Sequence, residues 1–163
     1  MAANDLNAAR LRELLHYDPD TGLFTWRLPR RGASAGNVAG TTVTRGYIMI
    51  RIDGVKRLAH RLAWLYVYGE WPSGCIDHID GQTSNNKLLN LRDVDVCINN
   101  QNRRRASSQN KSGFLGVETK NNRHRALIEV SGRRRTISWH DTPEEAHAAY
   151  LEAKRVLHPG CTI

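Results

Sequence analysis

The sequence contains little cysteine and no long apolar run, and each shortage excludes a class of protein. Its three cysteines, Cys75, Cys97 and Cys161, are scattered and odd in number. They make neither a disulfide framework nor a CxxC half-site, so no structural zinc is expected. No stretch approaches the roughly 20 apolar residues of a membrane-spanning helix. The first residues are polar and lack the basic-then-apolar order of a secretory signal. We therefore expect a cytoplasmic protein with no membrane partner.

Acidic residues are also scarce relative to basic ones. The chain has 24 Lys and Arg against 16 Asp and Glu, a net charge of +8. Arginine is concentrated after residue 100, in the runs 103–105 and 133–135. The planar guanidinium fork suits phosphate, and a basic face attracts polyanions. A solvated basic surface explains the same charge equally well, so charge alone does not decide for nucleic acid.

The first part of the chain is expected to form short helices and hairpins. Asp53-Gly54 is a strong two-residue turn signal between the strand segments 46–52 and 55–60. The remaining elements follow from apolar spacing and from turn residues. They are a helix over 5–16, a turn over 17–22, a strand over 23–27 and a helix over about 58–68 that Gly69 and Pro72 end.

The periodicity changes in the second part of the chain. Residues 73–92 are rich in turn residues, 93–104 have helical spacing, and the polar stretch 106–113 is expected to be a linker. Three short strands are predicted within 114–140, separated by Asn121-Asn122 and Ser131-Gly132. Thr142 and Glu145 then form a capping box around Pro143, which predicts a helix behind the sheet.

The segment from Ile76 to Arg92 carries the chemistry. It reads Ile76-Asp77-His78-Ile79-Asp80-Gly81, and several carboxamides follow before Asn90-Leu91-Arg92. Phosphodiester hydrolysis needs a group that activates water and a cation that neutralises the phosphate and the leaving oxygen. His78 can act as the base because the ordinary pKa of histidine lies near neutral pH. Asp77 and an asparagine offer the oxygen ligands that Mg²⁺ or Mn²⁺ prefers.

At these residues the chain resembles the HNH endonucleases, in particular the phage and homing type in which the second motif histidine is an asparagine. The likeness covers about 55–103, including the lead-in Ala59-His60-Arg61, and the N-terminal region more loosely. It implies a ββα-metal (His-Me finger) core at about 74–104 within a nuclease domain over 1–105. It further implies roles for four residues: His78 as general base, Asp77 and Asn99 as metal ligands, and Asn90 as the residue that braces the loop.

Other residues near the motif are candidates for supporting roles. Asn102 lies three residues after Asn99 and would share its helix face, where it could support the metal site or contact a phosphate. His60 is a second candidate, although a histidine packed in a helix is the plainer interpretation. Arg103 and Arg104 follow the motif and are candidates for DNA contacts.

Residues 112–158 resemble the ethylene-response-factor type of DNA-binding domain, within an expected module over 114–163. That likeness implies a three-stranded antiparallel sheet in the major groove with a helix behind it. Arg123, Arg125, Arg133 and Arg135, at alternate strand positions, would contact bases and phosphates. The sequence departs from the family at His124, where tryptophan is usual, and at 137–140. The alternative is a sheet-and-helix interaction domain with a charged face.

Together these patterns predict an α+β chain that is a metal-dependent DNA endonuclease. A helix and a hairpin precede the nuclease core, and the sheet-plus-helix module follows it. One such centre would nick one strand of double-stranded DNA, with the protein a monomer or a weak dimer. Two alternatives stay open, a non-catalytic DNA-binding regulator on the same fold and a nuclease that acts on RNA. The target sequence and the biological role, whether homing, restriction or packaging, do not follow from these patterns.

Overall fold

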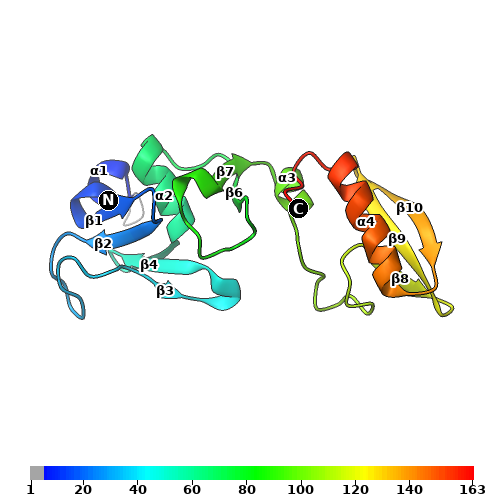
Figure 1. The fold of residues 1–163 in the computed structure, drawn as a ribbon. Helices are drawn as coiled ribbons and strands as arrows, with labels where there is room; N and C mark the ends of the chain where they lie inside the picture. The colour runs from blue at the N-terminus through cyan, green and yellow to red at the C-terminus, as the bar shows by residue number, and fades with distance from the viewer. Residues whose placement is uncertain (1–5) are drawn as a thin grey trace. The chain divides into compact units, whose positions relative to one another are not determined.

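The computed structural model describes residues 6–163 and has an α+β fold made of several small antiparallel sheets and helices. The chain divides into two compact units, Met1–Val94 and Asp95–Ile163, and each has its own hydrophobic core. In the described part of the chain, no helix combines the length and the apolar character needed to cross a membrane. Figure 1 labels the elements in chain order.

The first unit is built from two short helices and small antiparallel sheets. In chain order its elements are α1 (Ala8–Leu14), β1 (Leu15–Asp18), β2 (Leu23–Trp26), β3 (Thr41–Thr42), the 3₁₀ turn η1 (Thr44–Gly46), β4 (Ile48–Ile52), β5 (Val55–Leu58), α2 (Ala59–Tyr68), β6 (Cys75–His78), the 3₁₀ turn η2 (Leu88–Asn90) and β7 (Leu91–Val94). The strands form the sheets β1-β2, β3-β4-β5 and β6-β7. Leu11, Leu15, Ile52 and Leu62 are completely buried in its core.

The first helix is shorter than the sequence predicts at both ends. It begins after Asn7, whose side chain accepts a hydrogen bond from the Arg10 amide at 2.8 Å. Asp5, the first residue of the helix predicted over 5–16, lies outside the described residues. The helix ends at Leu14 because Leu15 pairs with Trp26 as the first residue of a hairpin. Pairing between strands, which local helical spacing does not reveal, therefore decides where this helix ends.

The turn between β1 and β2 supports the loop that follows β6. A Cβ on Gly22, whose φ is 75°, would lie 2.4 Å from the Asn86 carbonyl carbon. The Leu88 amide donates to the Pro19 carbonyl at 3.0 Å. The buried Tyr17 hydroxyl donates to the Asn86 carbonyl at 2.6 Å. The N-terminal hairpin therefore fixes the backbone around Asn86.

The hairpin β4-β5 and helix α2 confirm the pattern read from the sequence. Asp53 and Gly54 both have positive φ, 47° and 83°, as a tight two-residue turn requires. Helix α2 follows β5 without a gap and ends at Gly69, which adopts the left-handed conformation with φ 83°. Its buried face places His60 inside the unit.

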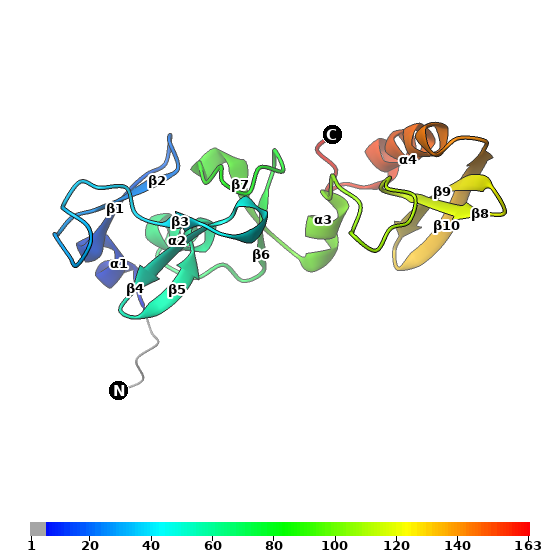
Figure 2. The same cartoon turned by 90° about the horizontal axis from the view of Figure 1, so that it is seen from below.

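The second unit is a three-stranded antiparallel sheet covered by one long helix. Its elements are α3 (Val96–Gln101), β8 (Val117–Lys120), β9 (Arg123–Val130), β10 (Arg133–His140) and α4 (Pro143–Leu157), with strand order β10-β9-β8. Figures 1 and 2 both show α4 lying along one face of this sheet. Thr142 caps α4 by accepting from the Glu145 amide at 3.3 Å, as the capping box predicts.

Helix α3 is tied to the C-terminal tail of the second unit. It is capped by Asp95, covers six residues rather than the twelve expected over 93–104, and is followed by turns. The Gly160 amide donates to the Gln101 side chain at 2.9 Å, and the buried amine of Lys154 donates to the Arg103 carbonyl. The division between the units thus falls before α3, whereas the sequence places a linker at 106–113, and that linker remains a prediction.

Gly116 gives a test of the second core. A Cβ on Gly116 would lie 2.1 Å from the Tyr150 ring, whereas a Cβ on Gly113 would meet nothing within 4 Å. Both glycines have nearly the same φ, 76° and 75°, so Gly116→Ala and Gly113→Ala carry a similar backbone cost. We expect Gly116→Ala to cost about 1–3 kcal/mol more, because the core must shift around the new methyl group.

The measurement is amide hydrogen exchange along β9 in the full-length chain, which reports the unfolding of this unit alone. Equal loss of protection in the two variants would contradict the packing of Tyr150 against Gly116.

Candidate active site

The strands β6 and β7 place the two residues expected to do the chemistry. Asp77 pairs with Arg92, and His78, the last residue of β6, pairs with Leu91. Asp77 and His78 are only 6% and 4% exposed. Since consecutive strand residues leave on opposite faces, the two side chains have different neighbours.

His78 lies among polar and aromatic side chains. Its Nε2 is 3.2 Å from Asn86 Oδ1, and its ring centroid is 5.0 Å from that of His60 and 6.0 Å from that of Tyr47. Burial lowers the pKa of His78, although the hydrogen bond to Asn86 and the charges of Asp80 and Asp77 raise it in part. The ring is therefore neutral at neutral pH and able to accept a proton.

The Asn86 carboxamide sets which ring nitrogen carries the proton. Its Nδ2 donates to the Ser84 carbonyl at 3.3 Å, which leaves Oδ1 as the atom that faces His78. A carboxamide oxygen only accepts hydrogen bonds, so this contact favours the tautomer of His78 that carries its proton on Nε2. Nδ1 is then the nitrogen that can take up a proton.

The Asn90 carboxamide closes the loop between β6 and β7. Its Oδ1 accepts from the Asp80 amide at 3.0 Å, and its Nδ2 donates to Asp80 Oδ1 at 2.9 Å and to the Asn85 carbonyl at 2.8 Å. The Ile79 amide donates to the Asn90 carbonyl at 2.9 Å. Burial opposes the ionised form of Asp80, but bonds from Asn85, the Gln82 amide and Asn90 outweigh it and lower the pKa of Asp80. The loop is thus a network around one ionised carboxylate.

Asp77 is held by the arginine opposite it in the hairpin. Arg92 contacts Asp77 Oδ2 through Nε at 2.8 Å and through Nη2 at 2.7 Å. The pair is largely shielded, with side-chain exposures of 26% for Arg92 and 7% for Asp77. A charge-assisted contact of this kind fixes the carboxylate in one orientation.

The metal-ligand roles expected of Asp77 and Asn99 remain predictions. Within residues 6–163, no three His, Cys, Asp or Glu side chains gather so that they could hold a metal ion. Of the two expected ligands, only Asp77 belongs to these residue types, because the side chain of Asn99 is a carboxamide. Asp77 has the oxygen chemistry that Mg²⁺ prefers, and its carboxylate already faces the cation of Arg92. Asn99 lies half-buried on α3 in the second unit, and its ligand role remains a prediction.

The two supporting candidates have different surroundings. His60 lies beside His78, and its Nδ1 is one of the buried polar atoms without a hydrogen-bond partner among the described residues. Asn102 is buried in the second unit, where its Oδ1 accepts from the Thr162 hydroxyl at 2.5 Å. Arg104 contacts the same hydroxyl at 2.9 Å. Asn102 and Arg104 therefore help to fix the C-terminal tail.

The strand register separates the arginines proposed to contact DNA. Paired residues share a face, and Arg135 pairs with Ile128, which is buried in the core beside α4. Arg133 is on that same face, whereas Arg134 pairs with Glu129 on the opposite, open face. Arg123 and Arg125 also lie on the open face. Arg133 and Arg135 therefore lie on the face opposite that of Arg123 and Arg125, and the DNA contacts expected of all four remain predictions.

This difference has a local cause. The turn at Ser131-Gly132 pairs odd-numbered β9 residues with even-numbered β10 residues, and a bulge between Thr136 and Ser138 reverses the parity only farther along. On the open face, Arg125 contacts Glu118 at 2.8 Å and lies over the Trp139 ring at 5.6 Å. Arg123 lies 3.5 Å from the exposed Asp141.

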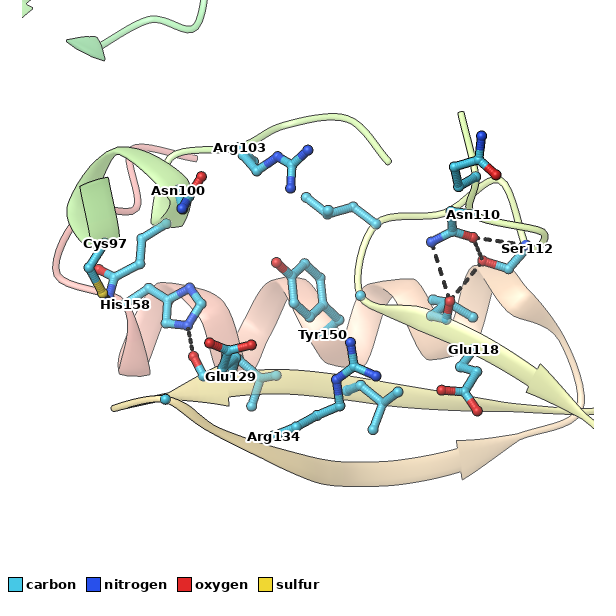
Figure 3. Close-up of a pocket in the computed structure, with 18 of the residues that line it drawn as sticks. Cys97, Asn100, Arg103, Asn110, Ser112, Glu118, Glu129, Arg134, Tyr150 and His158 are labelled. Carbon is cyan, nitrogen blue, oxygen red and sulfur yellow. Dashed lines mark hydrogen bonds between the residues drawn. The ribbon is translucent and has the colours of Figure 1, made fainter. Parts of the chain in front are cut away.

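A separate cavity of about 950 Å³ lies within the second unit. Figure 3 shows the guanidinium groups of Arg103 and Arg134 on either side of the Tyr150 ring, with His158 at one end. His158 Nε2 is 2.8 Å from the Glu129 carbonyl, which keeps that end of β9 covered. Asp77 and His78 do not line this cavity, so it does not contain the expected base.

Three residues of the site were not predicted from the sequence. Asn86 and Arg92 lie inside the segment that resembles the HNH endonucleases. Their polar side chains in that segment are the sequence feature that could have pointed to a role in the site. Tyr47 lies 31 positions before His78, between η1 and β4, and no sequence pattern connects the two. Only folding brings its ring against the histidine.

The comparisons with known proteins concern this region. Residues 57–101 match the family described as HNH endonuclease. That segment is less than half of the chain, and it includes Asp77, His78, Asn90 and Asn99. No curated protein and no solved structure matches the chain. The match supports a nuclease that binds nucleic acid. It does not reach β8–α4, so the likeness of that module to the ethylene-response-factor type remains a prediction.

The buried His60 gives a pH-dependent test of this site. Burial, together with the charges of His78 and Arg61, lowers the pKa of His60 from 6.5 to about 3. Between these values the unfolded chain binds a proton that the folded chain does not, so the free energy of unfolding should fall as the pH is lowered from 6.5. The loss attributable to His60 is at most about 1.4 kcal/mol per pH unit.

Urea unfolding of the wild type and of His60→Leu from pH 7 to pH 4 measures this. We expect a shallower pH dependence in His60→Leu, because its leucine cannot bind the proton. The exposed His16→Leu is the matched control and should keep the wild-type slope. A slope that does not change in His60→Leu would contradict the burial of a neutral His60.

Proposed function

We propose that this protein is a metal-dependent DNA endonuclease of the HNH type in which His78 activates the attacking water. The observation that carries the proposal is the state of His78. It is buried, its lowered pKa leaves the ring neutral at neutral pH, and Asn86 contacts its Nε2. A general base must be unprotonated at the working pH, as a neutral imidazole is, and the family match over 57–101 supports a nucleic-acid substrate.

Other residues of the chain would orient the base and hold the metal ion. Asn90 holds the loop that carries Asn86, so the orientation of the His78 ring depends on Asn90 indirectly. Asp77, and Asn99 from α3, would hold a Mg²⁺ or Mn²⁺ ion. When bound, that ion would neutralise charge on the phosphate and on the leaving oxygen. Because residues 6–163 contain one such histidine site, each molecule would nick one strand.

We further propose that the second unit holds the DNA duplex. By register, Arg123, Arg125 and Arg134 lie on the sheet face opposite the one that α4 covers, and Arg134 also lines the cavity beside Tyr150. A sheet with basic residues on its open face can enter the major groove while a helix stiffens it from behind. Arg133 and Arg135 are exposed on the α4 side and would contact flanking phosphates.

One observation favours the second candidate, a DNA-binding regulator without catalysis. The Asp77 carboxylate is already paired with Arg92, as a structural ion pair would be. On this alternative the same basic surfaces bind DNA and no bond is broken.

Nicking of a supercoiled plasmid separates the candidates. We expect the wild type to nick in Mg²⁺ or Mn²⁺ and not with chelator. His78→Ala should nick at least about 100-fold more slowly because the base is lost. The exposed His16→Ala should match the wild type. DNA binding without nicking in any divalent ion would establish the regulator, and preferential cleavage of RNA run in parallel would establish the RNA-directed nuclease.

The contact between Asn86 and His78 gives a second test. Asn86→Leu removes the acceptor, so we expect kcat to fall about tenfold or more while KM changes little, since the base is misoriented rather than lost. Asn86→Asp keeps an oxygen acceptor at this position and should retain more of the activity. Nitrogen NMR of the His78 ring should show a proton on Nε2 in the wild type and a mixture of tautomers in Asn86→Leu. An unchanged kcat and an unchanged tautomer in Asn86→Leu would contradict the role of Asn86.

A further inference from the structure

The turn η1 lies against the loop that follows β6, although 38 positions separate them in the sequence. The Thr83 hydroxyl donates to the Arg45 carbonyl at 2.5 Å. A Cβ on Gly46 would lie 3.0 Å from the same hydroxyl oxygen. The backbone of this turn is therefore in direct contact with the loop that Asn90 closes.

The residue after η1 contacts the candidate base itself. The Tyr47 ring centroid is 6.0 Å from that of His78 and 5.5 Å from that of His60. With the Thr83 bond, this anchors the turn at two points, one on the loop and one on the histidine. A side chain on η1 is thus held at a fixed place beside the site.

Arg45 occupies the centre of this turn in an unfavourable backbone conformation. Its φ is 64° and its ψ is 17°, the left-handed region that favours glycine or asparagine. Strain at a residue other than glycine persists only where the surrounding structure enforces it, and such residues gather at functional sites. Among the described residues, the exposed Arg45 side chain makes no hydrogen bond or ion pair, so it contributes no contact that explains its presence.

We propose that Arg45 binds a DNA phosphate adjacent to the one that is hydrolysed, so that η1 holds the strand against His78. This inference rests on the proposed nuclease function and adds a residue to it. An arginine guanidinium can make two parallel hydrogen bonds to one phosphate, and its long stem lets it reach the backbone of the DNA from a fixed turn. Arg45 has no carboxylate partner in the described chain that would compete with the phosphate.

The first experiment compares Arg45→Ala with Arg31→Ala in the plasmid-nicking reaction. Arg31 is exposed and lies with Asp53 and Gly54, at the far end of β4 from η1. Both variants lose one positive charge, so the comparison removes the general effect of charge. We expect kcat/KM to fall about tenfold or more in Arg45→Ala and less than about twofold in Arg31→Ala, because only the first loses a charged hydrogen bond to phosphate.

The second experiment locates the contact on the DNA. After the nick has been mapped, duplexes carrying a single neutral methylphosphonate at each position near the cut are tested. A methylphosphonate at one position adjacent to the cut should slow nicking by the wild type. The same substitution should cause no further loss in Arg45→Ala, because that variant already lacks the contact with this phosphate. In His78→Ala, where binding is measured without cleavage, adding Arg45→Ala should reduce the slope of log affinity against log salt by about 0.9.

The third comparison separates the side chain from the backbone. Arg45→Gly relieves the left-handed strain, so its Tm should be at least as high as that of the wild type while its nicking is as slow as that of Arg45→Ala. Wild-type nicking in Arg45→Gly would overturn the phosphate contact.

The failures of the two proposals can be told apart. If the wild type does not nick in any divalent ion, the nuclease function fails. If the wild type nicks but Arg45→Ala behaves like Arg31→Ala, the assignment of Arg45 is wrong and the nuclease function stands. The same conclusion follows if every methylphosphonate slows the wild type and Arg45→Ala equally.

Discussion

The candidate site depends on one constraint, the closure of the loop between β6 and β7 by the Asn90 carboxamide. This group bonds to both ends of the segment it encloses, at Asp80 and at Asn85. All three residues are half-buried, and each of these bonds restricts the arrangements that the loop can adopt. Asn86, fixed next to Asn85, then orients the His78 ring, and Thr83 holds the turn that carries Arg45. An orienting contact and a substrate contact thus follow from one set of hydrogen bonds.

Electrostatics separates two residues that are neighbours in the chain. His78 is kept neutral by burial beside two aromatic rings, one of them His60. Asp77 keeps a cationic partner in Arg92 across the hairpin. The alternation of a β-strand is what allows such different environments one residue apart. A proton acceptor and an anion can therefore coexist within one short strand.

In the second unit, the hydrogen-bond register decides which arginines can act together. The turn at Ser131-Gly132 places Arg134 on the open face with Arg125, and it places Arg135 opposite the buried Ile128. Three consecutive arginines therefore divide between the two faces of the sheet. Contacts within the unit also bring α3 to the C-terminal tail, through the Gln101 side chain and the Gly160 amide.

The sequence by itself determined the α+β class, the hairpin at Asp53-Gly54, the cap of α4 and the motif around His78, because turn chemistry, capping and motif spacing are local properties. Only the tertiary structure decided that the first helix ends before Leu15 and that the Tyr47 ring packs against His78. It also decided that Arg134 rather than Arg135 shares a sheet face with Arg125. These outcomes depend on pairing and packing between segments far apart in the chain. Their free energies exceed local preferences, and no short window of sequence contains both partners.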